Sequence, residues 1–137
     1  MRVKPFSGSG VIEGAPFEVW GGDQRRDLLY VDDAAEAFLY AAITKEAEGL
    51  ALNVGGNEPV TLTALAEHVI AANGGGKYYI REFPPERKRI DIGDFLTNDT
   101  RFRALSGWRP RFRLADGLRI HSNIIASISQ VTCRATR

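Results

Sequence analysis

One short window in the first quarter of the chain constrains the fold more than any other segment. Phe17–Trp20 has the composition of a strand, and the glycine pair Gly21-Gly22 after it indicates a turn. An arginine-aspartate pair and the apolar run Leu28–Val31 then predict a second strand, and Asp33 is a typical N-cap for the alanine-rich segment that follows. The order strand, turn, strand, helix places Arg26 at the turn-proximal end of a strand, where its guanidinium can face a cleft as an anion site.

Glycine and proline divide the rest of the chain into short elements. The sequence therefore predicts a mixed α/β (α+β) domain of short strands and three or four helices. We expect one folded unit over residues 1–129 and a flexible tail over 130–137. The expected helices span 34–43, 64–72 after a cap at Thr61 or Thr63, a short segment from Asp99 or Thr100 to Leu105, and about 114–128; the further strands span 50–54 and 77–83.

The size and charge of the chain limit what it can bind. With 137 residues, 44% of them hydrophobic, the chain is long enough for one domain with its own core. The formal net charge is +1, so no overall field favours nucleic acid or an anionic membrane, and any anion site must be local.

The residues that commonly bind metals or form disulfides are sparse. Cys133 is the lone cysteine, so an internal disulfide and a cysteine-built metal site are excluded. Neither His68 nor His121 has a second ligand at metal spacing, and we expect no metal site. No segment resembles a signal peptide or approaches the roughly 20 apolar residues of a membrane span, so a cytoplasmic location is expected.

Three motifs, in this order, resemble the substrate domain of the NAD-dependent epimerase/dehydratase family, the extended short-chain dehydrogenases/reductases. The first runs from Gly21 to Asp33 and is similar to the family pattern G-x-G-x-Q-x-R-D-x-x-Y-V-x-D. The second is Leu52–Gly55, similar to Y-N-V-G, and the third is Leu105–Pro110, similar to L-G-W-x-P. The resemblance covers most of the chain, from about Phe17 to about Ile125.

The resemblance implies particular binding residues. In this family two arginines hold the diphosphate of a nucleotide sugar, and the matching positions here are Arg26 and Arg89. Guanidinium groups suit this role because they form bidentate bonds to phosphate oxygens and stay charged. The strand that ends at Trp20 resembles the family's segment beside the nucleotide base, which makes Trp20 a base-side candidate.

The catalytic half of the family pattern is missing from this sequence. There is no glycine fingerprint of the G-x-G-x-x-G type, and none of the four tyrosines begins a Tyr-x-x-x-Lys motif. We therefore identify no catalytic residue and expect no cofactor to bind this chain alone. NAD(P) enters only if a separate chain supplies the Rossmann half.

Three functions remain open. The first is a stand-alone domain that binds a nucleotide diphosphate or nucleotide sugar without being an enzyme on its own. The second is the substrate-binding half of a split epimerase/dehydratase, and the third is an interaction module with a decayed site. In the family the strand matching residues 50–54 and the alanine-rich helix pack against the cofactor domain, so we expect this chain to cover them by forming a homo-oligomer.

Each candidate residue also has a purely structural interpretation. Arg26 and Asp27 could form an ordinary surface ion pair, worth less than about 1 kcal/mol. The cluster that contains Arg89 is balanced by nearby carboxylates and could be a solvated face. A tryptophan more often packs into a core than binds a ligand, an interpretation that we favour for Trp108 and leave open for Trp20.

Overall fold

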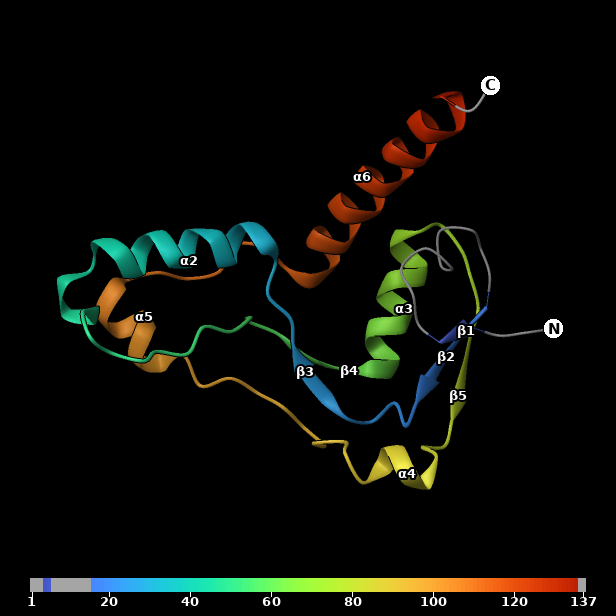
Figure 1. Ribbon diagram of the computed structural model, residues 1–137, viewed down its shortest axis with the longest axis horizontal. Helices are drawn as coiled ribbons and strands as arrows, with labels where there is room; N and C mark the ends of the chain where they lie inside the picture. Colours follow the sequence, from blue (N-terminus) through green and yellow to red (C-terminus); the bar gives the residue numbers. More distant parts are fainter. Residues whose placement is uncertain (1–3, 6–15, 136–137) are drawn as a thin grey trace. The chain divides into compact units, whose positions relative to one another are not determined.

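The computed structural model describes residues 4–5 and 16–135 (Figure 1). Its helices and short strands confirm the predicted mixed α/β class. The contacts of the chain separate into two compact units that alternate along the sequence. Unit 1 comprises Met1–Gln24, Thr61–Asp91 and Ala115–Arg137, and unit 2 comprises Arg25–Val60 and Ile92–Leu114.

Unit 1 is built on a three-stranded parallel sheet. β2 (Phe17–Trp20) lies between β1 (Lys4–Pro5) and β5 (Tyr78–Arg81), and every residue of β2 is paired with one of β5. Phe17 and Val19 alternate with less buried neighbours, as expected for a strand with one face on the core. These two side chains and Ala66 of α3 form the core of the unit.

The helices of unit 1 follow local capping rules. α3 (Leu62–Ala72) begins after Thr61, whose Oγ1 accepts a hydrogen bond from the Ala64 backbone N–H at 3.0 Å. This confirms one of the two caps predicted for this helix. α4 is a single turn, Pro85–Lys88, in a segment for which the sequence indicated no helix.

The last helix, α6, spans Leu114–Ala135. It continues past the end predicted near Ile128 and includes residues 130–135, which we predicted to be a flexible tail. No glycine or proline follows Gly117 in this segment, so no residue there interrupts the backbone hydrogen bonds of the helix. Residues 136–137 of the predicted tail lie outside the described residues.

Unit 2 contains three helical segments, a short strand pair and long stretches of coil. β3 (Arg25–Asp27) pairs with β4 (Pro59–Thr61), and α2 (Val31–Ile43) leads through the 3₁₀ turn η1 (Lys45–Ala47) toward a long coil. α5 (Thr100–Ser106) ends at Gly107, whose φ of 72° suits a glycine C-cap, as predicted. The core of unit 2 joins Ala37, Phe102 and Trp108, which confirms the packing role expected for Trp108.

Asp33 has a different role from the one predicted. The predicted second strand is present as β3, but it spans Arg25–Asp27 and does not extend over Leu28–Val31. α2 begins at Val31 rather than at residue 34, so Asp33 is not an N-cap. The Asp33 side chain is fully buried, and its two carboxylate oxygens accept the backbone N–H groups of Arg111 and Phe112, both at 3.0 Å. Asp33 therefore ties the first turn of α2 to the segment before α6.

The strand predicted over residues 50–54 is also wrong. This segment has no regular secondary structure and forms no ladder with any described residue. Leu52 and Val54 pack against the core of unit 2, so their apolar pattern reflects side-chain packing rather than sheet pairing. No described helix is both long and apolar enough to cross a membrane.

Candidate functional site

Arg26 lies in the middle of β3, where two backbone carbonyls hold its side chain. Its Nη1 donates to the carbonyl oxygen of Arg25 at 2.8 Å and to the carbonyl oxygen of Gly93. An isolated parallel bridge joins Arg26 to Phe95, and the Phe95 N–H donates to the Arg25 carbonyl at 3.0 Å. The guanidinium is thus fixed beside the loop that precedes Phe95.

The same loop is fastened to β3 by two carboxylates. Asp94 accepts both the backbone N–H of Arg25, at 2.7 Å, and its Nε, at 2.9 Å. These hydrogen bonds, first the backbone one and then the guanidinium one, lower the pKa of Asp94 below its usual value. Asp27 accepts the N–H of Thr97 at 3.0 Å, so Asp27 binds the loop rather than pairing with Arg26.

The sequence reasoning missed Asp94 as a positioning residue. It lies 69 positions from Arg25, and no local pattern links the two. The only available signal was its place in the arginine-rich passage that the family resemblance marks as part of the site.

Arg89 is an exposed residue that follows α4 as its C-cap. Among the described residues, its side chain makes no recorded hydrogen bond or ion pair. Arg89 belongs to unit 1 and Arg26 to unit 2, so the structure describes each arginine within its own unit. The pairing of the two arginines remains a proposal.

Trp20 ends β2 in unit 1 and is partly covered by an arginine. The guanidinium carbon of Arg87 lies 4.5 Å from the centre of the indole, and Phe83 meets the ring edge-on at 6.3 Å. The indole N–H donates to Glu18 at 3.4 Å. A planar ligand that stacked on this covered face would have to displace Arg87, a residue that the sequence reasoning did not assign to Trp20.

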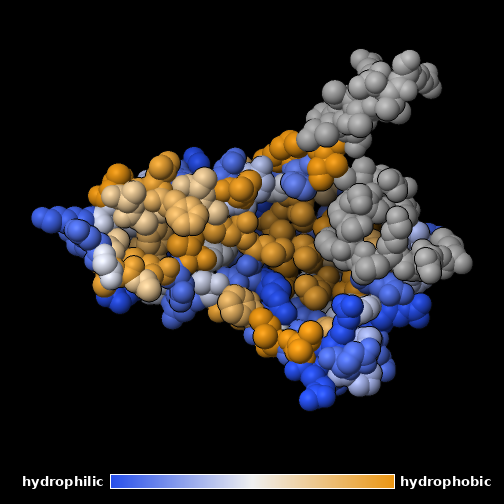
Figure 2. All heavy atoms as spheres, in the orientation of Figure 1, coloured by the Kyte–Doolittle hydropathy of each residue, from blue (hydrophilic) through white to orange (hydrophobic). Residues whose placement is uncertain are grey.

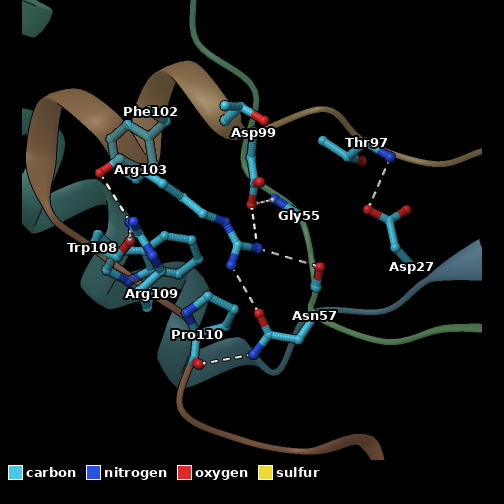
Figure 3. A network of polar contacts seen from close by, with 12 residues as sticks. Asp27, Gly55, Asn57, Thr97, Asp99, Phe102, Arg103, Trp108, Arg109 and Pro110 are labelled. Atoms are coloured by element: carbon cyan, nitrogen blue, oxygen red, sulfur yellow. Dashed lines mark hydrogen bonds and ion pairs between the residues drawn. The ribbon is translucent and has the colours of Figure 1, made fainter.

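A second polar network in unit 2 surrounds Arg103 (Figure 3). Its Nη2 contacts Asp99 at 2.7 Å and its Nη1 donates to Asn57 at 2.9 Å, while Asn57 donates to the carbonyl of Pro110 at 3.0 Å. Asp99 also accepts the N–H of Gly55 at 3.3 Å. The network joins the coil after η1 to α5 and to the segment that follows it.

This network explains why Asp99 does not cap α5 with its side chain. Asp99 occupies the predicted N-cap position, but its carboxylate binds Arg103 and Gly55 instead of the helix N–H groups. The Nε of Arg103 and the indole N–H of Trp108 are buried without a partner among the described residues. We assign this network a structural role, because every contact recorded for it lies within unit 2.

No group of three or more His, Cys, Asp or Glu residues in the described ranges could hold a metal ion. Both histidines are exposed. Desolvation and the nearby Glu67 raise the pKa of the Tyr78 hydroxyl, to which Glu67 lies close enough for a 3.3 Å hydrogen bond. Tyr78 packs beside Phe17 in the sheet of unit 1, so we assign it to packing.

Comparison with known proteins shows a family model and several relatives that this chain resembles. A family model described as "NAD dependent epimerase/dehydratase family" matches residues 9–55. The dTDP-glucose 4,6-dehydratase of Streptomyces niveus is 30% identical over 118 residues, which cover 85% of this chain and 34% of the relative. The GDP-mannose 3,5-epimerase of Arabidopsis thaliana is 33% identical over 106 residues, which cover 76% of this chain and 26% of the relative.

A solved structure shows the same fold. An epimerase from Methanothermobacter thermautotrophicus superposes with a TM-score of 0.80 and 17% identity, covering 93% of this chain and 38% of that one. The chain thus spans about a third of the length of the curated relatives that it matches.

Proposed function

The chain belongs to the NAD-dependent epimerase/dehydratase family, of which it spans only part, and on that premise we propose that it binds a nucleotide diphosphate or nucleotide sugar. The observation that carries the proposal is the placement of Arg26. Its guanidinium is fixed by the backbone carbonyls of Arg25 and Gly93 instead of moving freely in solvent. A pre-positioned guanidinium loses little side-chain entropy when a phosphate binds to it.

The clasp between Arg25 and Asp94 supports this role. Asp94 binds Arg25, the residue before Arg26, and so holds the 93–97 loop against β3. The carbonyl of Gly93, which accepts from Arg26, is thereby kept in place. Among the curated relatives, the names of two enzymes specify dTDP-glucose and GDP-mannose, which both carry a diphosphate. We therefore assign a phosphate of such a ligand to Arg26, while the roles expected for Arg89 and Trp20, which belong to unit 1, stay predictions.

We propose no catalytic residue within this chain. The sequence contains neither the glycine fingerprint that holds a dinucleotide pyrophosphate nor a Tyr-x-x-x-Lys motif. The glycine run 74–76 is not such a cradle either, because it follows a helix and precedes a strand, the wrong order for a phosphate loop. Any NAD(P) chemistry would thus need residues from outside this sequence.

Isothermal titration calorimetry with UDP-, dTDP- and GDP-sugars tests the proposal. Losing one charge-assisted bond to phosphate removes about 1.5–3 kcal/mol, so Arg26→Ala should weaken binding about 10- to 100-fold. The affinity of Arg26→Lys should fall between those of the parent chain and Arg26→Ala, because lysine keeps the charge but loses the bidentate fork. Arg101→Ala is a matched control, since Arg101 is an exposed arginine of the same unit.

Two results would contradict the proposal. The first is that none of the three nucleotide sugars binds more tightly than about 1 mM, a weak affinity near −4 kcal/mol. The second is that Arg26→Ala and Arg101→Ala bind alike. Either result would favour an interaction module with a decayed site.

One observation favours the split enzyme as a second candidate. The segment 50–54 pairs with no strand in the described part of the chain, and Leu50 is exposed. A segment of strand-like composition that makes no ladder hydrogen bonds is suited to join a sheet supplied by another chain. Copurification with a chain that carries a glycine fingerprint, lost on Leu52→Pro but kept on Leu52→Val, would establish this candidate.

A further inference from the structure

Arg87 carries a guanidinium that rests on an aromatic ring and makes no recorded hydrogen bond. It belongs to α4, the turn that follows the end of β5 (Figure 1), and its guanidinium carbon lies 4.5 Å from the centre of the Trp20 indole. Figure 2 shows hydrophilic side chains gathered on the surface over α4. The Arg87 side chain is exposed, and within the described ranges none of its N–H donors has an acceptor.

Trp20 is held more firmly than the cation that covers it. Its indole N–H donates to Glu18 at 3.4 Å, and Phe83 meets the ring edge-on, with 6.3 Å between the ring centres. The other oxygen of Glu18 accepts from the Nε of Arg81 at 3.0 Å. Both Glu18 oxygens thus have partners other than Arg87. The arrangement is a fixed aromatic ring with an exposed cation on one face, and all of it lies in unit 1.

We propose that Trp20 and Arg87 form a site for a nucleobase that carries a carbonyl oxygen, namely uracil, thymine or guanine, and that Arg87 selects the base. The inference rests on the proposed function for the class of ligand, and its geometry lies within unit 1 alone. When the base binds, it stacks on the indole in place of the guanidinium. Arg87 then moves to the edge of the base and donates hydrogen bonds to it.

The strengths of the two contacts favour this exchange. An exposed cation–π contact changes an equilibrium constant about two- to fivefold, whereas stacking a base on an aromatic side chain changes it about 5- to 150-fold. A base therefore displaces the guanidinium from the ring. The backbone of Arg87 stays beside the site, because its N–H donates to the carbonyl of Pro84 at 2.9 Å and keeps the turn of α4 closed.

The chemistry of the guanidinium determines which bases the site accepts. Arginine only donates hydrogen bonds, so the edge of the base that meets Arg87 must accept them. Uracil, thymine and guanine present a carbonyl oxygen where cytosine and adenine present an amino group, and an amino group would set donor against donor. One good bidentate contact discriminates between bases about 5- to 150-fold, so we expect UDP to bind more tightly than CDP, and GDP more tightly than ADP, by a factor in this range.

Isothermal titration calorimetry with these nucleoside diphosphates tests the selection, because the members of each pair differ in the base. The parent chain should prefer UDP and GDP, and Arg87→Ala should bind the members of each pair alike. Arg87→Lys should lose most of the preference, since lysine keeps the charge without the planar fork. Lys88→Ala is the matched control: it removes a positive charge from the next position of α4 and should leave the preference unchanged.

The aromatic ring has its own pair of variants. Trp20→Phe keeps a ring for stacking and for the cation–π contact, so it should keep the preference for UDP over CDP. Trp20→Leu removes both contacts. It should weaken the binding of all these nucleotides about 5- to 150-fold and should reduce the preference as well.

Fluorescence of Trp20 separates this inference from the proposed function. Free uridine and cytidine carry no phosphate, so quenching of Trp20 emission by them reports the base site alone. Trp108 is 1% exposed and supplies a steady background, which Trp20→Phe measures. Uridine should quench the parent at lower concentrations than cytidine does, and the two nucleosides should quench Arg87→Ala alike.

The possible failures can be told apart. Equal binding of UDP and CDP by the parent would overturn the role of Arg87, while a loss of affinity in Arg26→Ala would still support the diphosphate site. If no diphosphate binds but uridine still quenches better than cytidine, the proposed function fails and the base site stands. Trp20 emission that responds to neither nucleoside would overturn the base site.

Discussion

The buried carboxylate of Asp33 should be one of the most sensitive positions in unit 2. It accepts two backbone N–H groups, those of Arg111 and Phe112, each at 3.0 Å. A hydrogen bond to a charged group contributes about 1.5–3 kcal/mol, so two contribute about 3–6 kcal/mol. Asp33→Ala should lose nearly all of this, a large part of the about 5–15 kcal/mol of a typical domain. Asp33→Asn keeps one acceptor oxygen and should lose about half.

Urea unfolding followed by tryptophan fluorescence measures this loss. In a Trp20→Phe background the signal comes from Trp108, which is 1% exposed and packs in the core of the same unit. With a slope of about 1–3 kcal/mol per M urea, Asp33→Asn should lower the unfolding midpoint by about 1 M. Asp33→Ala should lower it by about twice as much.

The exposed carboxylate one residue earlier supplies the control. Asp32→Asn removes the same charge from the same helix turn but breaks no recorded hydrogen bond, so it should cost less than about 1 kcal/mol through the helix dipole. If Asp33→Asn unfolds at the same urea concentration as Asp32→Asn, the two backbone hydrogen bonds do not stabilise the unit as argued.

Three further predictions follow from single contacts. Gly56→Ala should destabilise the chain by at least about 2 kcal/mol, because the added Cβ would overlap the Leu28 carbonyl oxygen. In thermal melts it should lose more than Gly74→Ala, which meets no atom within 4 Å and carries only the cost of alanine at a φ of 72°, about 1–2 kcal/mol. Thr61→Ala should cost about 1 kcal/mol by removing the α3 cap, with Thr61→Ser close to the parent in the same melts. The pKa of Asp94 is lowered in the folded chain, so its hydrogen bonds to Arg25 stabilise the fold at neutral pH, and this stabilisation is lost as the pH falls through the lowered pKa. The difference in melting temperature between the parent and Asp94→Asn should therefore shrink in acid. A constant difference from pH 7 to about pH 2 would contradict this reasoning.

Local rules predicted the elements whose causes are local. The Thr61 cap, the glycine at the end of α5 and the position of β2 each depend on a few neighbouring residues, and the structure confirms all three. The family resemblance rested on the spacing of short motifs and was likewise confirmed. Site residues depend on more distant contacts, and the roles of Arg26, Arg89 and Trp20 stay predictions.

The errors have a common physical origin. Asp33 is a residue type typical of an N-cap, but the backbone N–H donors that its carboxylate binds lie 78 and 79 residues away, which no local pattern encodes. Residues 50–54 have the composition of a strand, but a strand needs a neighbour, and the described chain supplies none. The carboxylates that fasten residues 93–97 to β3 were missed for the same reason.

The chain passes between its two units four times, at 24/25, 60/61, 91/92 and 114/115. No single cut can therefore release either unit alone, because each unit is assembled from separated stretches of sequence. A nick at one crossing leaves two fragments that still share at least one unit, and these should stay associated until every shared unit melts. Grafting unit 2 into another protein would require two inserted segments, 25–60 and 92–114, that must assemble with each other to form one core.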